Sequence, residues 1–211
     1  MKDKKVWIRT ILCLFPIVIG LILWNQFPSQ MPVHWNAEGK VDGWSSKAFA
    51  VFFLPLFMTG MELLVSFVLK SDPKNHHQDK FIYQLGLWII PVLSIVIMII
   101  TYLTALGTKV PINIILMGIL GIFFILLGNQ MPKTRQNYTI GIKIPWTLNS
   151  EQNWNLTHRM AGPLWVIGGF AMILSGFVSD NTVFILCFVI DIFVLTLVPI
   201  IYSYLLYKKG I

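Results

Sequence analysis

The stretch "FIYQLGLWIIPVLSIVIMIITYLTAL", from Phe81 to Leu106, contains no charged residue and decides the fold. A helix needs about 20 consecutive apolar residues to cross a membrane, because the hydrocarbon core of a bilayer is about 30 Å thick. This stretch exceeds that length, and it has no polar face that could lie on the surface of a soluble protein. We therefore expect a transmembrane helix here.

Five other apolar stretches are long enough to cross a membrane, which makes six predicted spans. The spans lie near Val6–Trp24, Ala48–Leu69, Phe81–Leu106, Pro111–Leu127, Ala161–Val178 and Thr182–Tyr204. Only 12% of the 211 residues are charged, whereas a soluble domain has about 25%. We predict an all-α integral membrane protein in which residues 1–211 form a single membrane domain. The first span follows "MKDKK" as a signal peptide would, but no small-residue cleavage site follows it, so we expect it to be retained.

The positive charges are distributed unequally between the two sides of the membrane. With the N-terminus inside, 13 of the 16 Lys and Arg residues fall on inner segments, and only Lys40, Lys47 and Lys109 fall on outer ones. This bias is the one expected from the positive-inside rule, so we place both termini in the cytoplasm. The net charge of +7 then reflects topology and does not predict direct binding of nucleic acid.

Two connections between the spans are too long to be simple turns. The outer connection covers residues 25–47 and the inner one residues 128–160. Both contain the order Met, Pro, Gly, Trp, at Met31, Pro32, Gly39 and Trp44 and at Met131, Pro132, Gly141 and Trp146. An inverted repeat would produce this order. Because the two connections share so few residues, however, chance or similar turn chemistry is the better explanation.

The inner connection contains turn-forming residues followed by the start of a helix. Pro132 ends the preceding helix, Gly141 suits a turn, and Pro145 favours an extended residue before it. The N-cap of the next helix is Asn149, with Thr147 and Ser150 as alternatives. One face of that helix carries Trp154, His158 and Ala161. We predict an interfacial helix on the inner membrane surface.

The two long connections carry a family resemblance. Residues 128–159, "GNQMPKTRQNYTIGIKIPWTLNSEQNWNLTHR", resemble the signature of the SdpI/YfhL family of Gram-positive membrane proteins. Residues 27–47, "FPSQMPVHWNAEGKVDGWSSK", resemble the small domain often found before it, here residues 1–70, with the SdpI-like region at residues 111–211. The resemblance implies immunity of a cell to its own secreted, membrane-active peptide toxin. In the best-known branch, it also implies a receptor that holds a cytosolic transcriptional repressor at the membrane.

This resemblance and the residue types predict two contact surfaces in the cell membrane. The outer connection, with acids and aromatic anchors, is expected to contact the peptide toxin. Its candidate residues are Pro32, His34, Trp35, Gly39, Asp42, Gly43 and Trp44. The inner connection is expected to bind membrane lipid or the repressor. Its candidate residues are Asn129, Met131, Pro132, Asn137, Gly141, Lys143, Pro145, Trp146, Thr147, Trp154, His158 and Arg159. Lys143 stands where the family often has Arg, which keeps the charge and loses a bidentate donor.

Two acidic residues, Glu62 and Asp191, lie inside predicted spans. Acids within a membrane are costly and typically mark a functional pathway. If the two share a proton, the protein is a proton-coupled transporter or exporter, which is the alternative function. The alternative explanation is structural, with each acid forming hydrogen bonds across helices.

Other chemistries have weaker support in the sequence. His34, Glu38 and Asp42 have a four-residue spacing, but they form a poor zinc site without a second His or Cys, so we expect no metal and no cofactor. The motifs H-E-x-x-H and G-x-S-x-G are absent, so we expect no enzyme. Close helix contacts are expected at Gly118 and Gly121 and at Ala171 and Ser175. They could form within or between subunits, and the sequence leaves the oligomeric state open.

Overall fold

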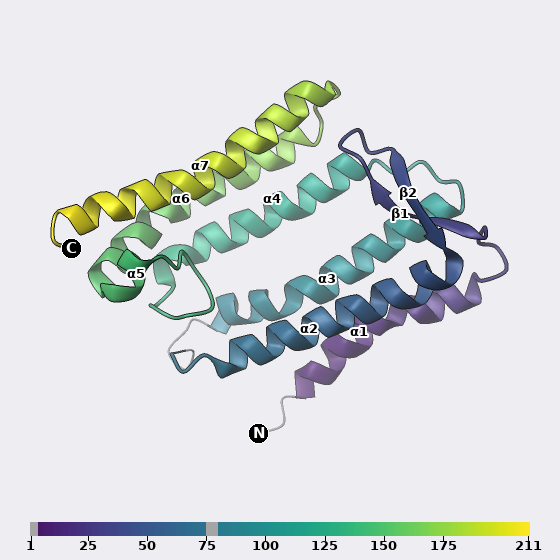
Figure 1. The fold of residues 1–211 in the computed structure, drawn as a ribbon, viewed down its shortest axis with the longest axis horizontal. Coiled ribbons are helices and arrows are strands. Elements are labelled where there is room, and N and C mark those ends of the chain that lie inside the picture. Colours follow the sequence, from purple (N-terminus) through teal and green to yellow (C-terminus); the bar gives the residue numbers. More distant parts are fainter. Residues whose placement is uncertain (1–3, 75–79) are drawn as a thin grey trace. The chain divides into compact units, whose positions relative to one another are not determined.

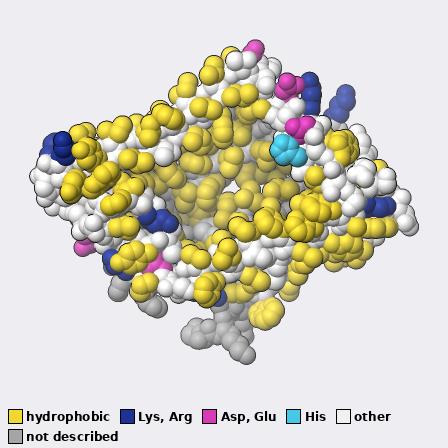
Figure 2. Space-filling view, viewed as in Figure 1, with side chains coloured by type: hydrophobic (Ala, Val, Ile, Leu, Met, Phe, Trp, Pro, Cys, Tyr) yellow, Lys and Arg dark blue, Asp and Glu magenta, His cyan; other side chains and the backbone are white. Residues whose placement is uncertain are grey.

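The computed structural model describes residues 4–74 and 80–211 and is mostly helical (Figure 1). Among these residues, five helices are long and apolar enough to cross a membrane, at Lys5–Ile22, Phe49–Ser71, Lys80–Ala105, Ile112–Lys133 and Asn181–Lys208. Hydrophobic side chains cover much of the visible helical surface, as expected for helices that contact lipid (Figure 2). The predicted class of a mainly α-helical membrane protein is confirmed.

The predicted fifth span lies almost entirely within α6 (Glu151–Ser175), which is not among those five helices. This helix begins ten residues before the predicted span, because the segment predicted to be an interfacial helix and the segment predicted to be the span form one continuous helix. Its first two turns are polar, with Glu151 and Arg159 exposed, and glycines lower the hydropathy of its second half. The number of spans therefore stays a prediction.

The chain divides into two compact units. The first unit contains residues 1–69 and 84–112, and the second contains residues 70–83 and 113–211. The first unit holds α1 (Lys4–Ile22), a π-helical turn (Phe49–Phe53), α2 (Leu54–Ser71) and most of α3 (Lys80–Ala105). The second holds nearly all of α4 (Ile112–Gln130), a 3-10 turn (Met131–Lys133), α5 (Pro145–Asn149), α6 and α7 (Asn181–Lys208).

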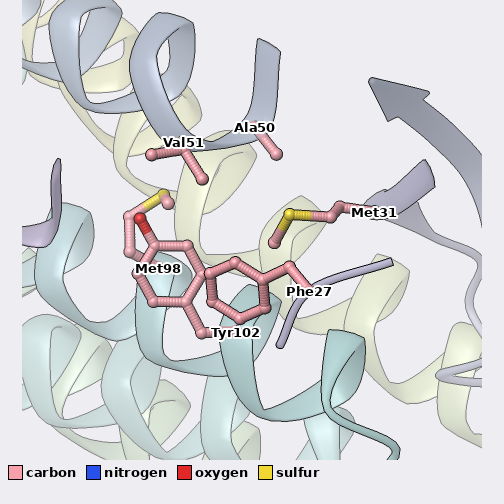
Figure 3. Packing of buried hydrophobic residues seen from close by; sticks show 6 residues of the cluster. All are labelled: Phe27, Met31, Ala50, Val51, Met98 and Tyr102. Atoms are coloured by element: carbon pink, nitrogen blue, oxygen red, sulfur yellow. The ribbon is translucent and has the colours of Figure 1, made fainter. Parts of the chain in front are cut away.

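A buried cluster at one end of the first unit joins α3, the π-helical turn and the segment before the first strand. Figure 3 shows its members, which are Phe27, Met31, Ala50, Val51, Met98 and Tyr102. The rings of Phe27 and Tyr102 have centroids 4.9 Å apart. The Tyr102 hydroxyl donates a hydrogen bond of 2.8 Å to the Pro16 carbonyl in α1. This cluster fixes the base from which the connection at residues 25–47 projects.

That connection contains a β-hairpin, which the all-α prediction omitted. Strands β1 (Gln30–Trp35) and β2 (Val41–Ser46) pair antiparallel. Residues alternate across a strand, so Met31 is buried in the cluster while His34 is exposed. At the turn, Gly39 has φ of 71°, and the Asn36 side chain accepts hydrogen bonds from two turn amides. We call residues 25–47 the hairpin segment.

In the second unit, α4 and α6 approach each other at pairs of glycines. A side chain on Gly128 would lie 2.7 Å from the Gly162 carbonyl, and one on Gly121 would clash with the Gly169 carbonyl. The seven-residue spacing places each set on one helix face, and only glycine lets the backbones come so close. The expected close contact at Gly121 is confirmed, whereas Gly118 faces open space.

Candidate functional site

The connection at residues 128–160, which we call the insert, is built around buried polar side chains of the second unit. Asn137 is fully buried. Its side-chain oxygen accepts hydrogen bonds from the amides of Thr139 (2.8 Å) and Ile140 (2.6 Å), and its amide group donates to the carbonyls of Arg135 and Ile140. Buried backbone groups need such partners, so Asn137 holds the turn in shape.

The next layer of the insert stacks an indole on an imidazole. Trp154 and His158 lie one turn apart on α6 with ring centroids 4.0 Å apart, and the Trp154 indole donates to the Thr134 carbonyl at 2.7 Å. Gly141 crosses above these rings with φ of +119°, and a Cβ there would lie 2.5 Å from His158 Nε2. The position therefore requires glycine for its backbone angle and for space.

Both ring nitrogens of His158 are used. Nε2 accepts a hydrogen bond from the Ile142 amide at 2.9 Å, so the proton is assigned to Nδ1, which lies 2.8 Å from the Trp154 carbonyl and donates to it. Burial lowers the pKa of His158 to about 4, although the bond to the Trp154 carbonyl opposes this shift. His158 is thus a neutral structural residue with no lone pair left for acid–base chemistry.

The end of the insert is organised by two helix starts. Ile144 is extended, with φ of −122° and ψ of 160°, as Pro145 predicted. The Thr147 hydroxyl accepts from the Ile144 amide (3.1 Å) and lies 2.7 Å from the Ile142 carbonyl, to which it donates. Among the three candidate N-caps of α6, Ser150 has this role and accepts from the Asn153 amide at 3.1 Å.

Sequence reasoning missed Asp72, in the turn after α2. Its carboxylate accepts from the Tyr138 amide at 2.9 Å and the Thr139 hydroxyl at 2.8 Å. Burial alone would raise the pKa of Asp72, but hydrogen bonds from Lys74, Thr139 and Tyr138 together hold this pKa below its usual value. Asp72 therefore fastens its turn to the insert as a carboxylate.

A second contact from the same turn reinforces the first. Lys74 Nζ donates to the side-chain oxygen of Gln136 at 3.0 Å and lies 4.8 Å from the centre of the Tyr138 ring. Gln136 in turn donates to the carbonyls of Thr147 and Leu148. The insert is thus braced from residues that are more than 60 positions away in sequence.

The end of α7 provides a third support for the insert. Of the insert residues that contact it, Trp146 was a predicted site residue and Asn153 was not. Asn153 is buried and donates to the carbonyls of Ser203 (3.0 Å) and Ile211 (3.1 Å). The Ser203 hydroxyl donates back to the Asn153 oxygen at 2.6 Å. The Trp146 ring lies 5.1 Å from that of Tyr204. An Asn near the start of a helix is common, so no sequence pattern indicates that Asn153 joins two helices.

The predicted insert residues fall into two groups by exposure. The buried ones are Met131, Asn137, Thr147, Trp154 and His158. The exposed ones are Asn129, Pro132, Lys143, Pro145 and Arg159, while Gly141 and Trp146 are intermediate. The exposed and intermediate residues can meet a partner while the insert stays folded. The buried group determines how that surface is shaped.

On the hairpin segment, charged and aromatic side chains of both strands are exposed. His34 Nδ1 and Asp42 Oδ1 are 2.5 Å apart, and their side chains are 69% and 43% exposed. Trp44 is 57% exposed. Gly43 lies opposite His34, where a Cβ would be 2.7 Å from the His34 Cβ. The hairpin thus brings His34 next to Asp42 and Gly43 and leaves Trp44 exposed, whereas Pro32 is buried and Trp35 is half-buried.

Other side chains of the hairpin segment pair locally. Lys40 and Glu38 form an exposed ion pair of 2.7 Å near the turn, so Glu38 points to Lys40. Among residues 4–74 and 80–211, no three His, Cys, Asp or Glu side chains converge as metal ligands would.

The two acids of the predicted spans have different surroundings. Glu62 of α2 is buried, and its carboxylate accepts from Arg9 Nε at 2.9 Å and from the Ser66 hydroxyl at 2.8 Å. The Thr10 hydroxyl approaches the other oxygen at 3.3 Å. Asp191 of α7 has a buried Oδ2 that no donor in the described part of the chain reaches. The contacts of Glu62 therefore match the structural explanation of such an acid.

The apolar helices define a multi-pass cell membrane protein with two ordered polar segments. The sequence model of the SdpI/YfhL protein family matches residues 133–203, and a domain of unknown function, DUF1648, matches residues 11–59. The chain is 30% identical over 207 residues to Immunity protein SdpI of Bacillus subtilis (strain 168), which covers 98% of this chain and 97% of that protein. The chain belongs to the SdpI/YfhL family, as its motifs predicted. No solved structure matches it.

Proposed function

We propose that this protein gives its cell immunity to a secreted, membrane-active peptide toxin by binding, without catalysis. The observation that carries the proposal is the similarity to Immunity protein SdpI, which extends over 98% of the chain. It includes both polar segments, so the relative shares the parts of the chain that differ most from a plain membrane anchor. A Gram-positive bacterium is the expected source.

The proposed topology has six spans and cytoplasmic termini. It rests on the distribution of Lys and Arg, and it makes the second half of α6 the additional span. Glycines at the α4–α6 contact support this assignment, because close backbone packing suits helices in lipid. The hairpin segment then faces the outside, and the insert faces the cytoplasm.

The toxin-binding surface in this proposal is the outer face of the hairpin. His34, Asp42 and Trp44 are all exposed on the two paired strands, and His34 contacts Asp42. A large aromatic residue supplies apolar contact area, and a carboxylate suits a cationic peptide. Trp44 is the proposed anchor, and Asp42 the proposed partner of a basic residue.

The cytoplasmic surface in this proposal is the exposed part of the insert. Lys143, Pro145 and Arg159 are exposed around its buried core, and they suit anionic lipid head groups or an acidic patch on a cytosolic repressor. Signalling requires the toxin to bind one conformation more tightly than another. The supports of the insert from Asp72 and α7 are the contacts through which such a change would reach it.

Proton-coupled transport, the alternative function, has no comparable support. The Glu62 carboxylate accepts hydrogen bonds from Arg9, Ser66 and Thr10. These contacts are those of an acid that joins two helices, and they match the structural explanation of Glu62. A Glu62→Gln variant that folds but exports nothing would restore this alternative.

The test of the proposal is survival of a toxin-sensitive Gram-positive host that expresses this chain and is challenged with a panel of membrane-active peptides. Expression of the wild type should protect against at least one peptide, and Trp44→Ala should remove that protection at equal membrane levels. Lys109→Ala, an exposed residue outside the hairpin segment, is the matched control and should protect fully. Failure of the wild type against every peptide, despite correct insertion, would refute the proposal.

A further inference from the structure

A pocket of about 450 Å³, which we call the α6–α7 cavity, lies between α6 and α7 within the second unit and is open on one side, where Leu174 and Ile190 are exposed. Its walls are mainly apolar, with Met172, Leu174, Phe188 and Val194 among them. Known sites for small ligands have this size and this kind of lining, with a few polar groups that orient the ligand. None of its lining residues belongs to the hairpin segment or to the insert.

The acidic group in the cavity wall is Asp191. Its Oδ2 is buried and has no hydrogen-bond partner in the described part of the chain. Gly168 of α6 makes room for this carboxyl group, since a Cβ there would lie 2.9 Å from Asp191 Oδ1. A carboxyl group without a donor in an apolar environment is unfavourable, so a ligand that brings a donor would gain from meeting it.

The hydroxyl group of Ser175, which also lines the cavity, does not donate a hydrogen bond to Asp191. The Ser175 hydroxyl donates to the Met172 carbonyl of its own helix at 2.7 Å, so it presents only acceptor capacity to the cavity. The lining residues include no Lys or Arg. Apart from the weak donor Cys187, the polar side chains of the cavity are acceptors, and the complement is an apolar molecule with a donor or a positive charge.

We propose that the α6–α7 cavity binds an amphiphilic amine, with its ammonium group at Asp191 and its chain against the apolar wall. An ammonium donates strong hydrogen bonds to a carboxylate, and their attraction is larger in an apolar site than in water. The apolar chain is buried between two helices of the membrane domain. This proposal does not rest on the proposed immunity function.

The test uses dodecylamine that carries a photoreactive diazirine on its chain, with the full-length protein in phosphatidylcholine vesicles and labelled peptides mapped by mass spectrometry. Labelling should concentrate in residues 171–178 and 187–194, and excess dodecylamine should compete with it. Asp191→Asn should lower the competed labelling about tenfold, because a hydrogen bond between charged groups is lost.

Two further variants keep the test independent of misfolding. Glu151→Gln removes an exposed acid from the first turn of α6 and should label as the wild type does. Ala171→Phe fills the cavity and should lose labelling although Asp191 is intact. Equal labelling of Asp191→Asn and wild type, or equal labelling by a photoreactive dodecanol, would overturn the proposal.

The same experiment separates two sources of the amine. Replacing part of the phosphatidylcholine with phosphatidylethanolamine introduces an amine on a membrane lipid. Competition by that lipid would identify a lipid head group as the ligand, whereas undiminished labelling would point to a free amine. Either result, together with loss of labelling in Asp191→Asn, supports an amine at this carboxyl group.

Discussion

The hairpin segment and the insert are both long polar connections between apolar helices, but they use their polar residues in opposite ways. The insert buries Asn137, Thr147 and His158 as partners for its own backbone. The hairpin segment pairs its backbone through two strands, which leaves His34 and Asp42 exposed. A motif can therefore be specific because of the shape it maintains or because of the surface it presents.

Among the variants that test this contrast, Gly141→Val is expected to lower the stability of the protein most. The variant forces a β-branched residue to φ of +119° and drives its Cβ into His158, so we expect a loss of about 3 kcal/mol or more in the free energy of unfolding. Thermal unfolding in detergent and limited proteolysis of the insert measure it. Gly118→Ala faces open space and should melt within a degree or two of the wild type.

Asn137→Leu tests whether one buried amide holds the turn of the insert. It leaves the amides of Thr139 and Ile140 without their acceptor, which should cost about 2–3 kcal/mol. Asn155→Leu is a control on the exposed side of α6 and should have a much smaller effect. Equal melting temperatures for the two variants would show that the insert is held by other contacts.

The protonation of His158 predicts a pH dependence of stability. Its pKa is lowered from 6.5 to about 4 in the folded protein, so the unfolded chain binds more protons between these values. The stabilisation is complete above pH 6.5 and falls by about 1.4 kcal/mol per pH unit as the pH drops towards 4. The pKa of Asp72 is lowered from its ordinary value of 3.8, so its effect on stability is lost only below that pH. Asp72 therefore contributes little to the pH dependence between pH 4 and pH 6.5.

Melting temperatures measured from pH 7.5 to pH 4.5 check this dependence. The slope should flatten in His158→Gln, which keeps a side-chain acceptor and cannot titrate. An unchanged slope in that variant would assign the pH dependence to other groups.

The smallest expected effect on stability is that of His34→Ala. Its pair with Asp42 is exposed, and such pairs contribute at most about 1 kcal/mol, so the melting temperature should barely change. In the survival assay, the same variant should lose part of the protection if the hairpin face contacts the toxin. A large drop in melting temperature would instead give the hairpin pair a structural role.

The sequence predicted the helices well and long-range contacts poorly. Apolar length alone located most of the helices, and Pro145 predicted the extended Ile144 through local sterics. The hairpin was missed because its strands are six residues each and their alternation is interrupted by a register shift near His34. The motif residues of the insert were found, but not which of them are buried.

The supports of the insert could not be predicted for a different reason. Asp72 meets Tyr138 across 66 positions, and Asn153 meets Ser203 across 50. No periodicity or local propensity connects residues so far apart, and Asp before Pro73 reads only as a turn. Contacts of this kind depend on how the helices of the second unit pack.

The contact between Gly128 and Gly162 also bears on whether the insert can be transferred to another protein of the family. Because these two glycines touch, the insert starts and ends at nearly the same point in space, so closing this loop costs little additional entropy once the helices are packed. Residues 128–162 can then be treated as an exchangeable cassette. A chimera that receives this cassette from another family member should fold if residues 72–74 and the end of α7 are transferred with it.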